Sequence, residues 1–191
     1  MPRISAPTVA EHRAKQRAAL VQAGEDVLLA DGLAGVSPRT VTERAGLARS
    51  SFYDYFPTKD DLLVAIAIDA IERWDAEIEG VLTGVEPGLP ELRAFVEATM
   101  RMTAEGKHAI AGVLREAELS PSRFEDLMAL HDALLRPLLR VLGDLGIPEP
   151  RTAATLVEGV IGAGIRLVSY GVDHRQVSDD VYRLLTSGLV S

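Results

Sequence analysis

The sequence of 191 residues contains no cysteine. This absence excludes disulfides, thiolate catalysis and zinc sites built on cysteine, and it fits the cytoplasmic location that we expect. Histidine is scarce as well, and none of the four lies four residues from another, which is the spacing of a helical zinc pair. No Ser-His-Asp arrangement can be argued from the sequence. We therefore expect no metal and no cofactor, and we favour a function other than catalysis.

Long apolar runs are also missing. The first 17 residues are polar and contain no apolar core segment, so we expect no signal peptide. The longest apolar stretch, residues 153–168, contains Glu158 and Arg166, and we interpret it as too short and too charged to span a bilayer. Hydrophobic residues make up 47% of the chain and charged residues 25%, which is typical of a soluble globular protein.

Positive charge is in deficit, since the net charge is −8. The deficit is uneven: residues 1–58 carry seven Lys or Arg and six Asp or Glu, whereas residues 59–191 carry a net charge of −9. Arg13, Lys15 and Arg17 cluster near the N-terminus, where they form either phosphate contacts or a solvated helix end. If the protein binds a polyanion, the N-terminal part approaches it first, and a few placed cations rather than a broad basic field supply the affinity.

Helical periodicity dominates the sequence, and no stretch has the alternation of a strand. Leu20, Ala23 and Val27 mark the buried stripe of a first helix, and Pro137 predicts a kink or a break near Leu135 in a later one. The pattern predicts an all-α fold of about nine helices, with approximate bounds 9–31, 38–45, 49–56, 59–82, 91–105, 108–119, 121–145, 151–170 and 178–190.

The segment from Ser37 to Lys59 reads as two short helices joined by a tight turn. Ser37 followed by proline is a strong helix start, because the serine side chain accepts a hydrogen bond from a free backbone N–H. Gly46 is placed to end that helix in a left-handed conformation. In the second helix, Phe52 and Phe56 are four residues apart and form one apolar face.

The other faces of this second helix carry groups that can bind DNA. Arg49 can donate to guanine O6 and N7, Ser50 and Ser51 can bond to bases or phosphates, and Tyr53 and Tyr55 can reach phosphates. A helix-turn-helix places such a helix in the major groove. The alternative is an ordinary helical hairpin with solvated polar residues, and the spacing alone does not decide between them.

Three consecutive elements resemble the signature of the tetracycline-repressor (TetR) family of transcriptional regulators. They are Ala45-Gly46-Leu47, Tyr53-Asp54-Tyr55-Phe56 and Thr58-Lys59-Asp60-Asp61-Leu62. Residues 17–23 and 30–32 resemble the first helix of that family. The resemblance covers roughly residues 13–63, and the remainder is similar only in length and helical character. One departure is Ala48, which stands where the family usually has the serine that caps the recognition helix.

The resemblance implies a dimeric DNA-binding regulator, most often a repressor, that is released from a pseudo-palindromic operator by a small apolar or amphipathic ligand. Residues 1–58 would form the helix-turn-helix DNA-binding domain, with the motif at about 37–56, and residues 59–191 the ligand-binding and dimerisation domain. We expect base contacts from Arg39, Arg49, Ser50 and Ser51 and phosphate contacts from Ser37, Tyr53, Tyr55 and Lys59, and Thr40 completes the expected DNA-binding set.

Two apolar rows run along residues 151–170, and glycines keep one side of this helix thin. Either both rows are filled within one subunit, or one row packs on a second copy of the chain. Family members pair through their last two helices, so the resemblance favours the second alternative. The expected dimer interface consists of Leu156, Val160, Ala163, Leu167, Val181, Leu184 and Leu185.

A ligand would bind within the second domain, where large apolar side chains are available. The candidate ligand-binding residues are Trp74, Phe95, Met100, Met102, Phe124, Met128 and His131, although ordinary core packing explains each of them individually. The competing hypothesis for the whole chain is a helical small-molecule-binding module or an enzyme whose helix-turn-helix-like head is only structural. It predicts no sequence-selective binding of DNA.

Overall fold

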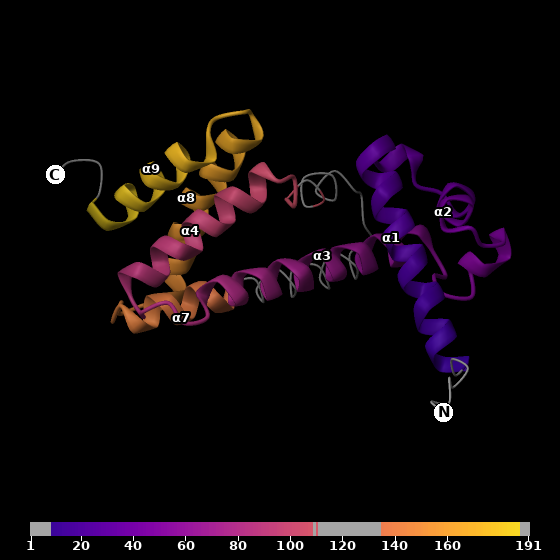
Figure 1. Ribbon diagram of the computed structural model, residues 1–191, viewed down its shortest axis with the longest axis horizontal. Coiled ribbons are helices and arrows are strands. Elements are labelled where there is room, and N and C mark those ends of the chain that lie inside the picture. Colours follow the sequence, from indigo (N-terminus) through magenta and orange to yellow (C-terminus); the bar gives the residue numbers. More distant parts are fainter. Residues whose placement is uncertain (1–8, 109, 111–134, 188–191) are drawn as a thin grey trace, which may run out of the picture. The chain divides into compact units, whose positions relative to one another are not determined.

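A computed structural model of the chain describes residues 9–108, 110 and 135–187. Within these residues all regular secondary structure is helical, which confirms the all-α class (Figure 1). The elements are α1 (Val9–Gly35), α2 (Pro38–Ala45), the 3-10 helix η1 (Arg49–Phe52), α3 (Lys59–Leu82), α4 (Leu89–Ala104), α7 (Arg136–Asp144), α8 (Pro150–Ser169) and α9 (His174–Ser187).

The described residues therefore hold seven α-helices, so the expected count of about nine is slightly off. One reason is that the expected helix 49–56 is only a four-residue 3-10 helix. The expected helix 108–119 and the first part of 121–145 lie mostly outside the described residues. Helix α7 begins at Arg136 with Pro137 in its first turn, beside the position where a kink or a break was expected.

The chain divides into two compact units. The described residues of the first unit are 9–69 and Ile110, and those of the second are 70–108 and 135–187. Helix α3 is continuous from Lys59 to Leu82, so its first part belongs to the first unit and its second part to the other. Its N-terminus is capped: Thr58 Oγ1 accepts from the Asp61 N–H at 3.2 Å, and Asp61 accepts from the Thr58 N–H at 3.0 Å.

The core of the first unit is formed by α1, α2, η1 and the first half of α3. Its fully buried side chains include Leu20, Leu28, Val41, Phe52, Phe56, Leu62 and Ile66. Gly24 is buried on α1, and a Cβ at this position would lie 3.0 Å from Ile66 Cδ1 and 3.1 Å from Leu62 Cδ2. The glycine allows α1 and α3 to pack closely, at the cost of some intrinsic helix propensity. Regular helix in α1 ends where expected, because Gly32 has a φ of 66°.

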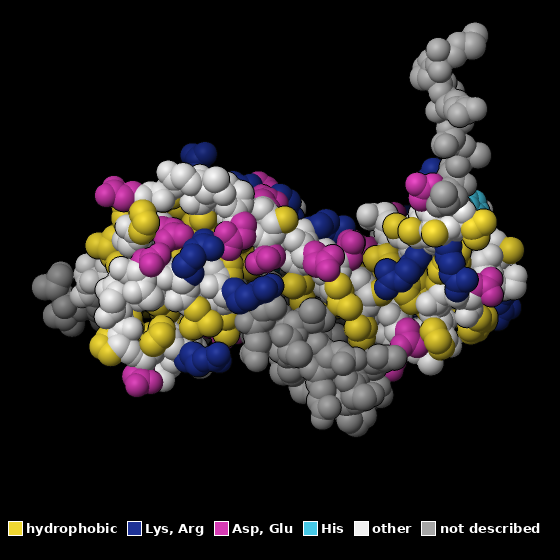
Figure 2. Space-filling model, turned by 90° about the horizontal axis from the view of Figure 1, so that it is seen from below, with side chains coloured by type: hydrophobic (Ala, Val, Ile, Leu, Met, Phe, Trp, Pro, Cys, Tyr) yellow, Lys and Arg dark blue, Asp and Glu magenta, His cyan; other side chains and the backbone are white. Residues whose placement is uncertain are grey.

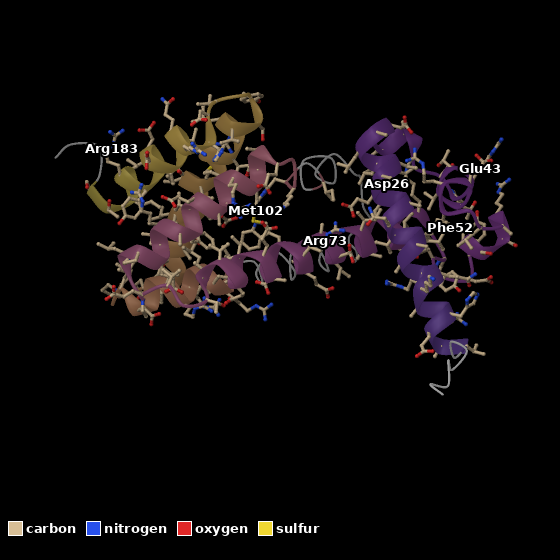
Figure 3. The ribbon with its side chains drawn as sticks, in the orientation of Figure 1. Asp26, Glu43, Phe52, Arg73, Met102 and Arg183 are labelled. Carbon is tan, nitrogen blue, oxygen red and sulfur yellow. The ribbon has the colours of Figure 1, made fainter. Side chains whose placement is uncertain are left out.

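The core of the second unit lies among α4, α7, α8, α9 and the second part of α3, which contributes Ile78 and Leu82. On α4, the buried side chains include Leu92, Phe95, Val96, Thr99 and Met102. Helix α8 comes close to α4 at Gly164, where a Cβ would lie 2.7 Å from Met100 Cε. Figure 3 shows Met102 on α4, among the side chains of this unit.

Helix α9 begins at His174, four residues before the expected start at residue 178. Asp173 explains the difference, because its Oδ1 accepts from the N–H groups of Arg175 and Gln176, both at 3.0 Å. These backbone bonds also lower the pKa of Asp173. Ser178 is not a cap: it is buried inside the helix and donates to the Arg175 carbonyl at 2.9 Å.

Helix α8 corrects the interpretation of residues 153–168 as too short and too charged to span a bilayer. The helix has 20 residues because it begins at Pro150, and its mean hydropathy of 1.3 makes it long and apolar enough to cross a membrane by length and composition alone. Of its most apolar stretch of 18 residues, only 22% is buried within the chain. A large apolar face of α8 is thus left uncovered by the described residues.

Candidate nucleic-acid interface

Helix α2 is fixed at both ends by local hydrogen bonds. Ser37 Oγ accepts from the Thr40 N–H at 3.2 Å, and Thr40 Oγ1 accepts from the Ser37 N–H at 3.0 Å. Pro38 occupies the first turn, where its missing N–H has no effect. At the other end Gly46 adopts the left-handed conformation, with φ 67° and ψ 31°. The Leu47 N–H then donates to the Thr42 carbonyl at 2.9 Å, which closes the turn.

The segment after this turn is not the regular helix over 49–56 that the sequence predicted. It is a 3-10 helix from Arg49 to Phe52 followed by turns, and the residue in the capping position, Ala48, makes no side-chain hydrogen bond. Because no cap fixes the start of this segment, the burial of its aromatic side chains stabilises it instead. Phe52 and Phe56 are almost fully buried, with ring centroids 5.9 Å apart. In Figure 3, Phe52 lies on the side of the segment that faces α1, whereas Glu43 points away.

Four of the expected DNA-binding side chains are exposed on this motif. Arg49 and Ser50 are exposed, and 55% of Tyr53 is accessible. Arg39 is exposed and donates to Glu43 at 2.8 Å, and this hydrogen bond raises the pKa of the Arg39 guanidinium. Ser51 is half-buried. These side chains project from α2 and η1, the two elements that a helix-turn-helix presents to DNA.

Other expected contacts already have partners within the first unit. The Thr40 hydroxyl proton points to the Gly35 carbonyl at 2.7 Å, and the Tyr55 hydroxyl donates to Gln16 Oε1 at 2.7 Å. A hydroxyl carries one proton and phosphate oxygens only accept, so neither group can donate to a phosphate in this geometry. Lys59 Nζ donates to the Leu33 carbonyl at 2.6 Å but retains two further protons.

Helix α1 adds residues whose role the sequence did not reveal. Arg13 Nη2 donates to the Asp54 carbonyl at 3.1 Å, and its guanidinium lies 5.5 Å from the centre of the Tyr55 ring. Arg17 lies 5.4 Å from the centre of the Phe56 ring. The spacing of Arg13, Gln16 and Arg17 places all three on one face of α1. That spacing is the one signal in the sequence that could have grouped them.

The surface is not broadly basic. Figure 2 shows one face of each unit, on which Lys and Arg side chains are interspersed with Asp and Glu. The described residues contain no group of three or more His, Asp or Glu side chains that could hold a metal ion. The chemistry available at this motif is hydrogen bonding and point-charge attraction from a few arginines, serines and tyrosines.

Comparison with known proteins identifies the motif. The profile of the family described as "Bacterial regulatory proteins, tetR family" matches residues 20–66, which include α2, η1 and the turn between them. Over these residues the chain is therefore similar to the N-terminal segment of TetR-family regulators. A relative in Bacillus subtilis (strain 168), the HTH-type transcriptional regulator YvdT, is 31% identical over 91 residues. That match spans 48% of this chain and 47% of the relative.

Solved structures of transcriptional regulators share the fold over more than nine tenths of the chain. FadR from Bacillus subtilis, solved in complex with stearoyl-CoA, has a TM-score of 0.78 at 18% identity and covers 91% of this chain and 99% of its own. LfrR from Mycobacterium smegmatis, a TetR-like regulator solved in complex with proflavine, has a TM-score of 0.66 at 23% identity and covers 93% and 98%. At these identities the likeness shows the fold alone.

The expected dimer residues fall into two groups. On α8, Leu156 is 69% exposed and Leu167 49% exposed, and Tyr170 beyond the helix is 84% exposed. Val160, Ala163, Leu184 and Leu185 are half-buried. Val181 is different, because it is buried within the chain, 3.0 Å from the position of a Cβ on Gly164. Val181 thus packs within its own chain, unlike the exposed leucines of α8.

The candidate ligand residues also separate. Phe95, Met100 and Met102 are buried in the core of the second unit, and Phe124, Met128 and His131 lie outside the described residues. Trp74 packs edge-to-face against Phe95 and His108, with ring centroids 6.1 and 6.3 Å away. Its Nε1 is enclosed and has no hydrogen-bond partner. Burial lowers the pKa of the neighbouring His108.

Proposed function

We propose that this chain is a ligand-responsive transcriptional repressor that binds a pseudo-palindromic operator as a dimer. The observation that carries the proposal is the capped α2–η1 motif, which holds Arg49, Ser50 and Tyr53 at the surface over a buried pair of phenylalanines. A dimer would place two such motifs in successive major grooves, about 34–36 Å apart or a multiple of that distance.

Within the motif, side chains that keep free donors are assigned to DNA. Arg39, Arg49, Ser50 and Ser51 are proposed to contact bases, and Tyr53 and Lys59 to contact phosphates. The Ser37 hydroxyl lies 3.0 Å from Thr40 Oγ1 and is assigned to the cap of α2 instead. Thr40 and Tyr55 are assigned to holding the motif, because their protons go to Gly35 and Gln16. The DNA-binding domain is proposed to comprise residues 1–58, and the ligand-binding and dimerisation domain residues 59–191.

The uncovered face of α8 supports the dimer. Leu156 and Leu167 are exposed along one side of the helix. At Gly159 a Cβ would have no atom within 4 Å, so a second helix could pack closely on this surface. Contiguous apolar patches on soluble proteins mark interaction sites. A two-fold dimer through this face would bury the leucines and present two motifs to one duplex.

A small apolar or amphipathic ligand in the second domain is proposed to release the operator. The enclosed Trp74 N–H without a partner supports this site, because a buried donor left unpaired is unfavourable and a ligand acceptor would satisfy it. FadR with stearoyl-CoA and LfrR with proflavine are structural neighbours that hold such molecules. The ligand would bind more tightly to a conformation in which the spacing of the two motifs does not match the operator, and it would shift the equilibrium toward that conformation.

A gel-shift titration with DNA from immediately upstream of the gene tests the proposal. We expect sequence-selective retention, and we expect Arg49→Ala to weaken it by about 1–3 kcal/mol because a bidentate contact to guanine is lost. Arg175→Ala removes an arginine that is also exposed, from the second unit, and serves as the matched control. Unchanged affinity in Arg49→Ala would remove Arg49 from the base contacts.

The same titration at several salt concentrations tests the phosphate contacts. Binding should weaken steeply as salt rises, because neutralised phosphates release counterions. A flat salt dependence would contradict phosphate anchoring. Absence of any sequence-selective retention would favour the other hypothesis, a helical binding module or enzyme with a structural head.

A further inference from the structure

We infer that Arg13, Gln16 and Arg17 of α1 form a clamp that positions the reading segment, residues 49–56, for operator binding, with Gln16 as its positioning residue. The inference rests on the proposed DNA-binding function and assigns to it residues that do not themselves touch DNA. It also changes the role of Tyr55 from a phosphate donor to the part of the reading segment that the clamp holds.

The reading segment has little means of holding its own shape. Its regular part is a single 3-10 turn of four residues, and runs of this kind have poorer hydrogen-bond geometry than an α-helix. Ala48 provides no side-chain cap. The backbone bonds after Phe52 are turns, from the Tyr55 and Phe56 N–H groups to the Phe52 carbonyl at 3.1 and 2.9 Å. The direction of the exposed side chains must therefore be set by contacts from elsewhere in the unit.

Those contacts come from one face of α1. Gln16 Oε1 accepts the Tyr55 hydroxyl proton at 2.7 Å, across 39 residues of sequence. One helical turn away, Arg13 donates to the Asp54 carbonyl at 3.1 Å and stacks over the Tyr55 ring. Arg17 lies over the buried Phe56 ring. The clamp thus engages three consecutive residues, Asp54, Tyr55 and Phe56, at the C-terminal end of the reading segment.

The roles within the clamp follow from its chemistry. Guanidinium groups over aromatic rings are attracted by the ring quadrupole, but they tolerate sliding across the ring face. A short hydroxyl-to-amide hydrogen bond is directional and fixes a distance. Gln16 is half-buried whereas Arg13 and Arg17 are exposed, so its bond to Tyr55 competes less with water. The Gln16–Tyr55 bond is therefore the part of the clamp that sets orientation.

A double-mutant cycle on operator binding tests this assignment. Gln16→Met keeps the size of the side chain and removes the strong acceptor, and Tyr55→Phe removes the donor. We expect each variant to bind the operator about three- to tenfold more weakly, and the double variant to bind no more weakly than either single one. Binding to random-sequence DNA should change little, because it depends on phosphate attraction and not on the orientation of base-contacting groups.

The control is Gln22→Met, which loses the bond to Asp26 on the same helix without touching the reading segment, and its operator affinity should match that of the unchanged protein. All titrations are run where circular dichroism shows each variant fully folded. Additive losses in the double variant would mean that Tyr55 contacts DNA directly, which overturns the inference. Equal losses on operator and random DNA would overturn it as well.

Amide chemical shifts of residues 49–56, measured without DNA, separate this inference from the proposed function. Gln16→Met should shift these amides in the same direction as Tyr55→Phe, and Gln22→Met should leave them in place. Unchanged amides in Gln16→Met would overturn the clamp whatever the DNA result. If the amides shift but the protein retains no DNA, the clamp still positions the reading segment. That result would contradict the proposed function and leave the clamp supported.

Discussion

Gly46 is the residue on which the turn between α2 and η1 depends. Its φ of 67° lies in the left-handed region, and no other atom comes within 4 Å of the position of a Cβ. Backbone conformation, rather than space, therefore restricts this position to glycine. The neighbouring Leu47 N–H reaches the Thr42 carbonyl only while that conformation is kept.

We predict that Gly46→Ala lowers the free energy of unfolding by about 1–2 kcal/mol, because a Cβ is strained in the left-handed region. Gly80→Ala is the matched control: Gly80 lies within α3 and also has open space around it, so alanine should raise stability by about 0.5–1 kcal/mol. Urea unfolding followed by circular dichroism measures both. Equal effects of the two substitutions would contradict the conformational explanation.

Arg140 shows how elements of the second unit are joined. From α7 it donates to Glu79 of α3 at 3.0 Å and to Glu91 of α4 at 3.2 Å. These hydrogen bonds raise the pKa of Arg140, with Glu79 as the first cause. The Glu91 side chain is only 7% exposed, and its second oxygen is buried with no partner. Arg140 thus donates a hydrogen bond to a carboxylate that has almost no access to water.

We predict that Arg140→Met destabilises the protein by about 1–3 kcal/mol, because it leaves Glu91 buried without its cation, while the half-exposed position of Arg140 moderates the effect. In a Glu91→Leu background the same substitution should have little effect, since an ion pair replaced by apolar groups of similar size is often close to neutral. Thermal unfolding of the four proteins gives the coupling. Additive losses would show that the two side chains do not depend on each other.

In the whole molecule, one apolar side of α8 is left uncovered by the described residues. Leu156 and Leu167 are exposed apolar side chains on a helix whose opposite face, including Ile161 and Val168, is buried in the chain. A helix that is apolar all round belongs in a buried environment, and this chain buries only one side of α8. The other side accounts for the composition that makes α8 resemble a membrane span.

We predict that Leu156→Glu together with Leu167→Glu converts a dimer to a monomer in analytical ultracentrifugation, because two carboxylates would have to be buried at the interface. Operator affinity should fall with it, since a monomer engages one half-site only. Leu89→Glu introduces the same charge at an exposed leucine of α4 and should change neither property. A monomeric parent protein, or an unchanged dimer in the double variant, would contradict the proposed interface.

Much of this fold could be read from the sequence, because many of its signals are local. Ser37 with Pro38, and Thr58 with Asp61, start helices within one turn of themselves, and Gly46 ends one. The bounds of α2 and α3 and the family signature between them followed from such neighbours. A helix start could still be misplaced, as for α9, which was expected to begin at residue 178 but is capped by Asp173.

Only the tertiary structure decided which groups meet across long separations. The sequence offered Tyr55 and Lys59 as phosphate contacts, but Gln16 lies 39 residues from Tyr55 and Leu33 lies 26 residues from Lys59, and no local pattern links such pairs. It likewise left open which row of α8 is buried. Hydrogen bonds within a turn are set by adjacent residues, whereas partners between helices are set by how whole faces pack, which the folded chain alone determines.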